Sequence, residues 1–141
     1  MGQLTILDLQ EKVGQMEQVS CPVEHLFAKG LYCRTIYLPA GSFVIGKRHK
    51  EETLNILLQG KLSVYKGENE EPETIEAPQL FVTQPNVKKV VFAHTGVLFA
   101  NVHATEQTDV YEIEKEVILP DDEYEGRLEQ FNIQLKELEQ E

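Results

Sequence analysis

A lysine and a histidine that follow a glycine turn are the first residues here whose types and spacing could do chemistry. The segment runs Leu38-Pro39-Ala40-Gly41, five residues, Lys47-Arg48-His49, three residues, Thr53, six residues and Gly60. An ammonium group attracts anions, and a neutral imidazole can bind a metal or transfer a proton. Because side chains two apart in a strand share a face, an inward His49 would bring Lys47, Thr53 and Asn55 inward with it. The alternative is that Lys47 and His49 lie in water near a barrel mouth.

Two later segments place further side chains on the same predicted interior. In one predicted strand, alternation places Val90, Phe92 and His94 on the same face. In the next, it places Phe99, Asn101 and His103 on the same face. A lysine together with histidines, an asparagine and aromatic rings describes a pocket for a small ligand that carries an anionic group.

The charged rim of this pocket is more open to interpretation. We expect Arg34 and Lys88 to add positive charge there. Three alternatives remain: a solvent-facing His94 beside a turn, a hydrogen-bonded core His103, and a solvated strand edge at Lys88 and Lys89.

Several function classes find no support in the sequence. It holds no nucleophile elbow, glycine-rich phosphate loop or H-E-x-x-H motif, which favours a binding protein over an enzyme. The net charge of −11 would repel nucleic acid. No run of eighteen apolar residues could span a membrane, and the N-terminus lacks signal-peptide features, so we expect a cytoplasmic protein. Cys21 and Cys33 are expected to be two buried thiols.

The elements that must position these residues are mostly short strands. A helix is predicted from Ile6 to Met16, ended by Cys21-Pro22. Apolar runs with a period of two then follow one another from Tyr32 to Leu119, and the last of them covers 110–119. Seven or eight short strands separated by turn residues predict an all-β sandwich or barrel.

The C-terminal segment reads as an acidic amphipathic helix. Residues 1–105 are nearly neutral, with 11 acidic and 10 basic side chains, whereas residues 106–141 carry 13 acidic and 3 basic ones. A heptad-like apolar stripe follows within this tail, formed by Tyr124, Leu128, Phe131, Leu135 and Leu138. We expect this helix to pack on the barrel or on a partner chain.

The segment from Leu38 to Gly60 resembles the first motif of the cupin family, which reads glycine, five residues, His-x-His, three or four residues, Glu, six residues and glycine. The second cupin motif reads Pro-x-Gly, two residues, His, three residues and Asn. Pro85-Asn86-Val87, then Val90, then His94 fit the same frame. The resemblance covers roughly residues 32–104 and implies the cupin fold, a double-stranded β-helix in a jelly-roll barrel.

In cupins, two histidines, a glutamate and a third histidine usually bind a divalent metal. The matching positions here hold Lys47, His49, Thr53 and Val90, so one ligand of the four is kept. An ammonium in place of an imidazole works against a divalent cation. We therefore expect no cofactor. The alternative is a divalent metal bound by His49 with His94 or His103.

The chain is also similar to small cupin-like proteins of tailed bacteriophages, in residues 23–34, 49–50 and 54–57. This similarity implies a place in the host bacterial cytoplasm and the capture of a signalling nucleotide as one concrete role.

Together these features predict one structural domain in three parts: a helix and arm at 1–31, a cupin-like barrel at 32–120 and an acidic helix at 121–141. The predicted function is capture of a small anionic ligand without a metal. Two alternatives stay open, a divalent-metal-dependent enzyme and a structural or partner-binding module that uses the acidic helix. Cupins commonly dimerise through their sheets, and Leu54, Ile56 and Leu58 face away from the pocket, so we expect a homodimer or higher oligomer.

Overall fold

The computed structural model describes residues 6–16, 18–67 and 71–122 of the chain. It begins with the predicted helix, α1 (Ile6–Gly14), which ends seven residues before Cys21. Glycine is a poor helix residue, so Gly14 is a natural place for the helix to stop. The Gln18 side chain donates 2.8 Å to the Val13 carbonyl, which satisfies one of the groups that a helix end leaves free.

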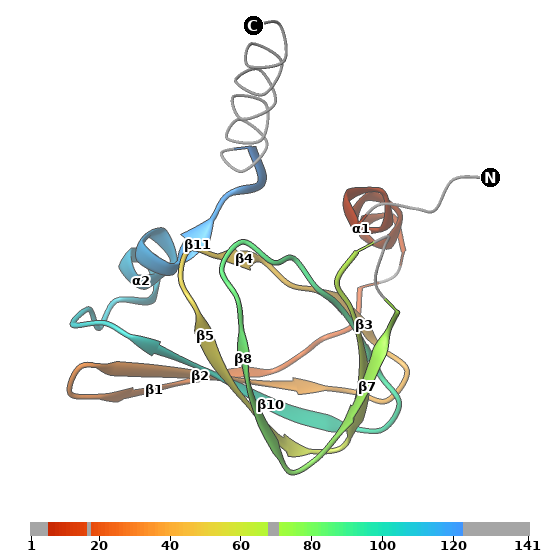
Figure 1. Ribbon diagram of the computed structural model, residues 1–141, viewed down its shortest axis with the longest axis horizontal. Coiled ribbons are helices and arrows are strands. Elements are labelled where there is room, and N and C mark those ends of the chain that lie inside the picture. Colours follow the sequence, from red (N-terminus) through yellow and green to blue (C-terminus); the bar gives the residue numbers. More distant parts are fainter. Residues whose placement is uncertain (1–5, 17, 68–70, 123–141) are drawn as a thin grey trace, which may run out of the picture.

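Two antiparallel sheets face each other and form the predicted all-β barrel (Figure 1). The larger sheet has five strands, in the order β1 (Val23–Ala28), β2 (Leu31–Leu38), β10 (Val97–Ala104), β5 (Thr53–Gln59) and β8 (Gln79–Thr83). The smaller has four, in the order β3 (Phe43–Ile45), β9 (Val90–Ala93), β6 (Lys61–Tyr65) and β7 (Glu73–Glu76). A short pair, β4 (Arg48–His49) and β11 (Ile118–Leu119), lies at one end of the barrel beside α2 (Val110–Val117).

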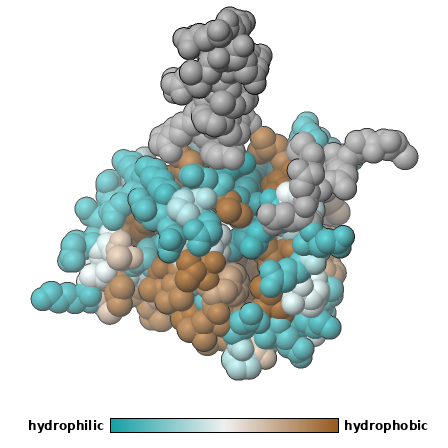
Figure 2. Space-filling model, viewed as in Figure 1, coloured by the Kyte–Doolittle hydropathy of each residue, from teal (hydrophilic) through white to brown (hydrophobic). Residues whose placement is uncertain are grey.

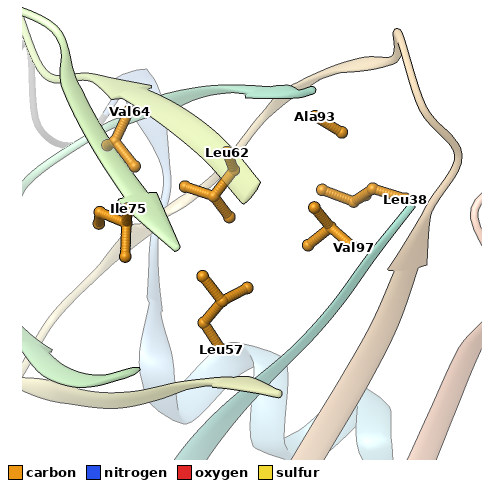
Figure 3. Packing of buried hydrophobic residues seen from close by; sticks show 7 residues of the cluster. All are labelled: Leu38, Leu57, Leu62, Val64, Ile75, Ala93 and Val97. Atoms are coloured by element: carbon orange, nitrogen blue, oxygen red, sulfur yellow. The ribbon is translucent and has the colours of Figure 1, made fainter. Parts of the chain in front are cut away.

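The hydrophobic core fills the space between the two sheets. Figure 3 shows its buried side chains converging from both sides: Leu38, Leu57 and Val97 from the larger sheet, and Leu62, Val64, Ile75 and Ala93 from the smaller. Leu57, Ala93 and Val97 are fully buried. Burial of such side chains stabilises a fold by about 1.5–3 kcal/mol each for the larger ones, so this cluster holds the two sheets together.

Gly60 makes the tight turn between β5 and β6. Its φ of +94° lies in the region that favours glycine, and a side chain there would collide with the Gly96 carbonyl oxygen. The last glycine of the first cupin-like motif therefore has a clear structural reason.

The segment 110–119, predicted as a strand, is instead a helix followed by a two-residue strand. Asp109 caps α2, because its side chain accepts a 3.2 Å hydrogen bond from the Glu112 backbone amide. Val110, Ile113 and Val117 are spaced by three and four residues, so the helix buries one stripe, and Ile113 is only 1% exposed.

Two other segments differ from the sequence prediction. The residues before Tyr32, where the predicted strands begin, already form β1, so the larger sheet starts at Val23. Cys21 and Cys33 are free thiols, both half-buried. The predicted C-terminal stripe falls in 123–141, outside the described residues. Among the helices of the described part, none is long and apolar enough to cross a membrane.

Candidate functional site

A cavity of about 220 Å³ opens between the two sheets at the end covered by α2. Most of its wall is apolar, and α2 contributes Val110, Ile113 and Val117 to it. The polar and charged groups that reach it are Tyr32, Arg34, Lys47, His49, Lys89, Asn101, His103 and Glu114. The sequence named five of these eight: Arg34, Lys47, His49, Asn101 and His103.

Strands β2 and β10 supply one wall of the cavity through their alternation. Asn101 pairs with Arg34 and His103 pairs with Tyr32 across the two strands, and all four line the cavity together with Phe99. The predicted shared face of Phe99, Asn101 and His103 is therefore present.

His49 and His103 meet inside this cavity. Their rings contact edge to face with centroids 5.0 Å apart. Burial and the charges of His103, Lys89 and Arg34 lower the pKa of His49 to about 4, and burial with the Arg34 charge also lowers the pKa of His103. Both imidazoles are thus neutral at pH 7, and each offers one donor and one acceptor.

Lys47 lies at the rim. Its side chain is exposed, yet it lines the cavity beside Glu114 of α2. The structure thus combines both sequence interpretations of Lys47, a pocket residue and a solvated mouth residue.

Thr53 and Asn55, predicted as ligand contacts, lie behind the cavity wall and do not line it. Both are buried, and Asn55 is 0% exposed. The Asn55 amide donates 2.7 Å to the Thr83 hydroxyl, and its oxygen accepts 2.6 Å from the Asn101 amide. Neighbouring strands satisfy these polar groups, so Asn55 positions Asn101 and leaves no group free for a ligand.

The predicted group of Val90, Phe92 and His94 does not face the cavity. Val91 lines it instead, opposite Val44 of β3, because the alternation of β9 is shifted by one residue from the predicted one. Phe92 packs against Phe43 with ring centroids 4.8 Å apart. His94 is exposed and lies 2.6 Å from the Ser63 hydroxyl.

Lys89 is the cationic residue of the cavity that the sequence did not predict; Tyr32 and Glu114 also line it without having been predicted. Lys88, predicted at the rim, is 5% exposed and binds Asp121, whereas Lys89 lines the cavity. The Lys89 ammonium donates 2.9 Å to the Thr83 hydroxyl and lies 5.5 and 5.9 Å from the ring centroids of Phe81 and Phe99. Burial and the nearby Lys66 charge lower the pKa of Lys89 to about 8.

A turn signal explains the shift from Val90 to Lys89. In the second cupin motif the glycine precedes the metal-binding histidine by three residues. The left-handed residue in this turn is Asn86, with φ +68°, and not Val87, and three residues after Asn86 comes Lys89. Asparagine tolerates the left-handed conformation better than a β-branched residue such as Val87 does. The sequence alone could therefore have indicated that Asn86, and not Val87, takes the place of the motif's glycine.

The residues that line the cavity do not fit a divalent metal. His94 lies on the outside, so the predicted alternative set of His49, His94 and His103 is not assembled. Within the described residues, no group of three His, Cys, Asp or Glu side chains could hold a metal ion. The positions that would supply metal ligands in cupins hold Lys47, His49, Thr53 and, after the one-residue shift, Lys89.

The fold is that of the cupin superfamily, a double-stranded β-helix, as the motif spacing predicted. A salicylate 1,2-dioxygenase of Pseudoaminobacter salicylatoxidans, solved as adducts with gentisate, superposes with a TM-score of 0.55 at 18% identity, over 77% of this chain and 31% of that one. An uncharacterized protein with a double-stranded β-helix domain from Klebsiella pneumoniae gives 0.54 at 10%, over 67% and 85%. An RmlC-like cupin family protein from Methanocaldococcus jannaschii gives 0.51 at 21%, over 66% and 94%.

Neither a family model nor a curated protein sequence matches this chain. The structural likenesses show the fold alone, so function has to be argued from the cavity.

Proposed function

We propose that this protein binds a small organic anion in the cavity, with the anionic group near the cationic side chains and an apolar body against the deeper wall. The observation that carries this proposal is the convergence of Arg34, Lys47 and Lys89 on one largely apolar cavity. Within the described residues, no carboxylate forms an ion pair with any of the three. Glu114 is the one carboxylate among the described lining residues, so it offsets only part of this positive charge, and a bound anion would offset more of it.

The lysines at positions where cupins have metal-binding histidines support the same proposal. Two ammonium groups, on Lys47 and Lys89, occupy positions at which cupins carry histidine. Like charges repel and opposite charges attract most strongly away from bulk water, so this arrangement disfavours a divalent cation and favours an anion.

The cavity volume limits the size of the ligand. The cavity measures about 220 Å³. Sites for drug-sized ligands usually hold about 300–1,000 Å³, so the volume favours a small organic acid over the signalling nucleotide that the bacteriophage resemblance suggested. The Phe81 and Phe99 rings favour a planar or aromatic body.

Amide chemical shifts in the presence of benzoate would test this function. We expect shifts at Phe99, Asn101 and His103 that saturate with benzoate, and much smaller shifts with benzyl alcohol, which has the same ring and no charge. Equal responses to the two compounds, or shifts confined to the outer surface, would overturn the proposal.

We also propose that a second copy of the chain covers the outer face of the larger sheet. Figure 2 shows hydrophobic surface where β5, β8 and β10 run. The register places apolar side chains next to one another on this face: Leu54 opposite Val82 and Val102, and Ile56 opposite Leu80 and Ala100. Leu80 is 65% exposed. The face bears no charge at these positions, so two copies of the chain, each with net charge −11, can meet there without placing like charges opposite one another at the contact.

A further inference from the structure

We infer that Lys89 forms a Schiff base with a ligand that carries an aldehyde or ketone group beside its anionic group. The inference rests on the proposed function, since the same cavity must first hold the anion.

The surroundings of Lys89 suit a nucleophilic amine. Its nitrogen lies near the Phe81 and Phe99 rings, inside a cavity with a mainly apolar wall. The hydrogen bond to the Thr83 hydroxyl fixes its position at 2.9 Å, and no carboxylate among the described residues pairs with it to hold it charged. Lysines used as nucleophiles are activated in this way, by removal from water into an apolar pocket.

The charge state is consistent with this placement. With a pKa of about 8, roughly a tenth of Lys89 is neutral at pH 7, against less than about a thousandth for an ordinary lysine. The neutral amine has the free electron pair that attack on a carbonyl requires.

The reaction balances without an oxidant or reductant. The Nζ electron pair attacks the carbonyl carbon and forms the N–C bond, while one of the two amine protons moves to the carbonyl oxygen and makes it a hydroxyl group. The C=N bond then forms as the second amine proton moves to this hydroxyl group and the C–O bond breaks, so the oxygen leaves as water. His49 lines the same cavity and is neutral, so its free ring nitrogen can accept a proton and pass it on.

The cavity therefore suits a small oxo acid. Its carboxylate would be held by Arg34 and Lys47 at the more open side, and its carbonyl carbon would reach Lys89 beside the aromatic rings. Thr83 accepts hydrogen bonds from both Lys89 and Asn55, so the polar network behind the wall fixes the amine relative to Asn101.

Trapping with 4-formylbenzoate and cyanoborohydride tests the inference. The reductant converts an imine into a stable secondary amine, which peptide mapping by mass spectrometry assigns to one lysine. We expect one adduct per chain, on Lys89, suppressed by excess benzoate. Lys89→Arg keeps the charge but should lose the adduct and still bind benzoate, whereas Lys61→Arg, at an exposed position on β6, should change nothing.

The two proposals can fail separately. Benzoate binding without an adduct on Lys89, or an adduct spread over exposed lysines, would overturn the Schiff base and leave the anion site standing. Loss of benzoate binding itself would remove both. If Lys89→Arg does not fold, the peptide map of the unchanged protein with and without benzoate decides the matter alone.

Discussion

The Lys88 ammonium lies 2.8 Å from each carboxylate oxygen of Asp121, and this pairing keeps Lys88 out of the cavity that Lys89 enters. Asp121 also accepts a 2.6 Å hydrogen bond from Arg48, so it holds two cations that are both less than a tenth exposed. Adjacent residues of a strand-like segment point to opposite sides, and one ion-pair cluster thus fixes which lysine serves the site.

Replacing Asp121 by Asn should destabilise the fold. Two buried cations would lose their counter-charge, but Asp121 itself is 34% exposed, so water would screen part of the loss. We expect a decrease of about 1–2 kcal/mol in the free energy of unfolding, measured by urea denaturation. Glu73→Gln, at an exposed position on β7, is the matched control and should have no effect.

The loss of stability in Asp121→Asn should depend on pH. Burial raises the pKa of Asp121, but the hydrogen bond and charge of Lys88 and the charge of Arg48 outweigh this and lower it below its usual value. A lowered carboxyl pKa gives stability that is present above the unfolded-state pKa, about 3.9, and is lost as pH falls through the folded-state value. The difference between wild type and Asp121→Asn should therefore shrink below about pH 4. A constant difference down to the acid transition would contradict the assignment.

His49 should make stability depend on pH in a different range. Its folded-state pKa of about 4 lies below the unfolded value of about 6.5, so between these values the unfolded chain binds a proton that the folded chain refuses. The free energy of unfolding should fall as pH drops from 6.5 to 4. His49→Gln should flatten this slope, and His94→Gln, outside the cavity, should leave it unchanged; equal slopes in all three proteins would refute the effect.

The hydrogen bonds of the buried Asn55 side chain should stabilise the fold and hold the cavity residue Asn101 in place. Removal of this side chain takes the acceptor from the half-buried Asn101 amide and one of two donors from the buried Thr83 hydroxyl, so Asn55→Ala should cost about 2–3 kcal/mol in the free energy of unfolding. In a double-mutant cycle with Asn101→Ala, the two effects should deviate from additivity by at least ~0.5 kcal/mol. Additive effects would mean that the hydrogen bond between them contributes nothing.

The outer face of the larger sheet predicts a dimer. Light scattering after gel filtration should give about twice the chain mass of 16.1 kDa. Leu80→Glu should return it to one chain mass, because two like charges would enter the interface. Phe43→Glu, an equally polar change at an exposed position of the other sheet, should keep the dimer. A wild-type protein of one chain mass would end the proposal.

The spacing of turns and motifs was enough to predict the barrel and one wall of the cavity. Alternation along 97–104 gave Phe99, Asn101 and His103 correctly, because β10 pairs with β2 in one unbroken register over that stretch. It failed after Pro85, since a left-handed Asn86 shifts the alternation by one and brings in Lys89 and Val91 for Val90 and Phe92. It also failed at 110–117, where Val110, Ile113 and Val117 recur at helical spacing and the Asp109 cap favours a helix.

Residues behind the wall were beyond reach of the sequence for a different reason. Asn55 and Thr53 do share the predicted face, but strand pairing brings Asn101 and Thr83 against them, and these two neighbours take up hydrogen bonds of Asn55. The Thr53 hydroxyl donates 3.5 Å to the Glu51 carbonyl. Alternation along a strand predicts which face of the sheet a side chain lies on. Whether a polar side chain on that face stays free to bind a ligand depends on its neighbours in the paired strands.

Calorimetric titration of benzoate into the wild type and Arg34→Met tests the central claim most directly. A charge-assisted hydrogen bond is worth about 1.5–3 kcal/mol, so Arg34→Met should weaken binding by roughly 10- to 150-fold, with Lys61→Met as the unaffected control. Equal affinities in wild type and Arg34→Met would contradict an anion site built on the cationic side chains of the cavity.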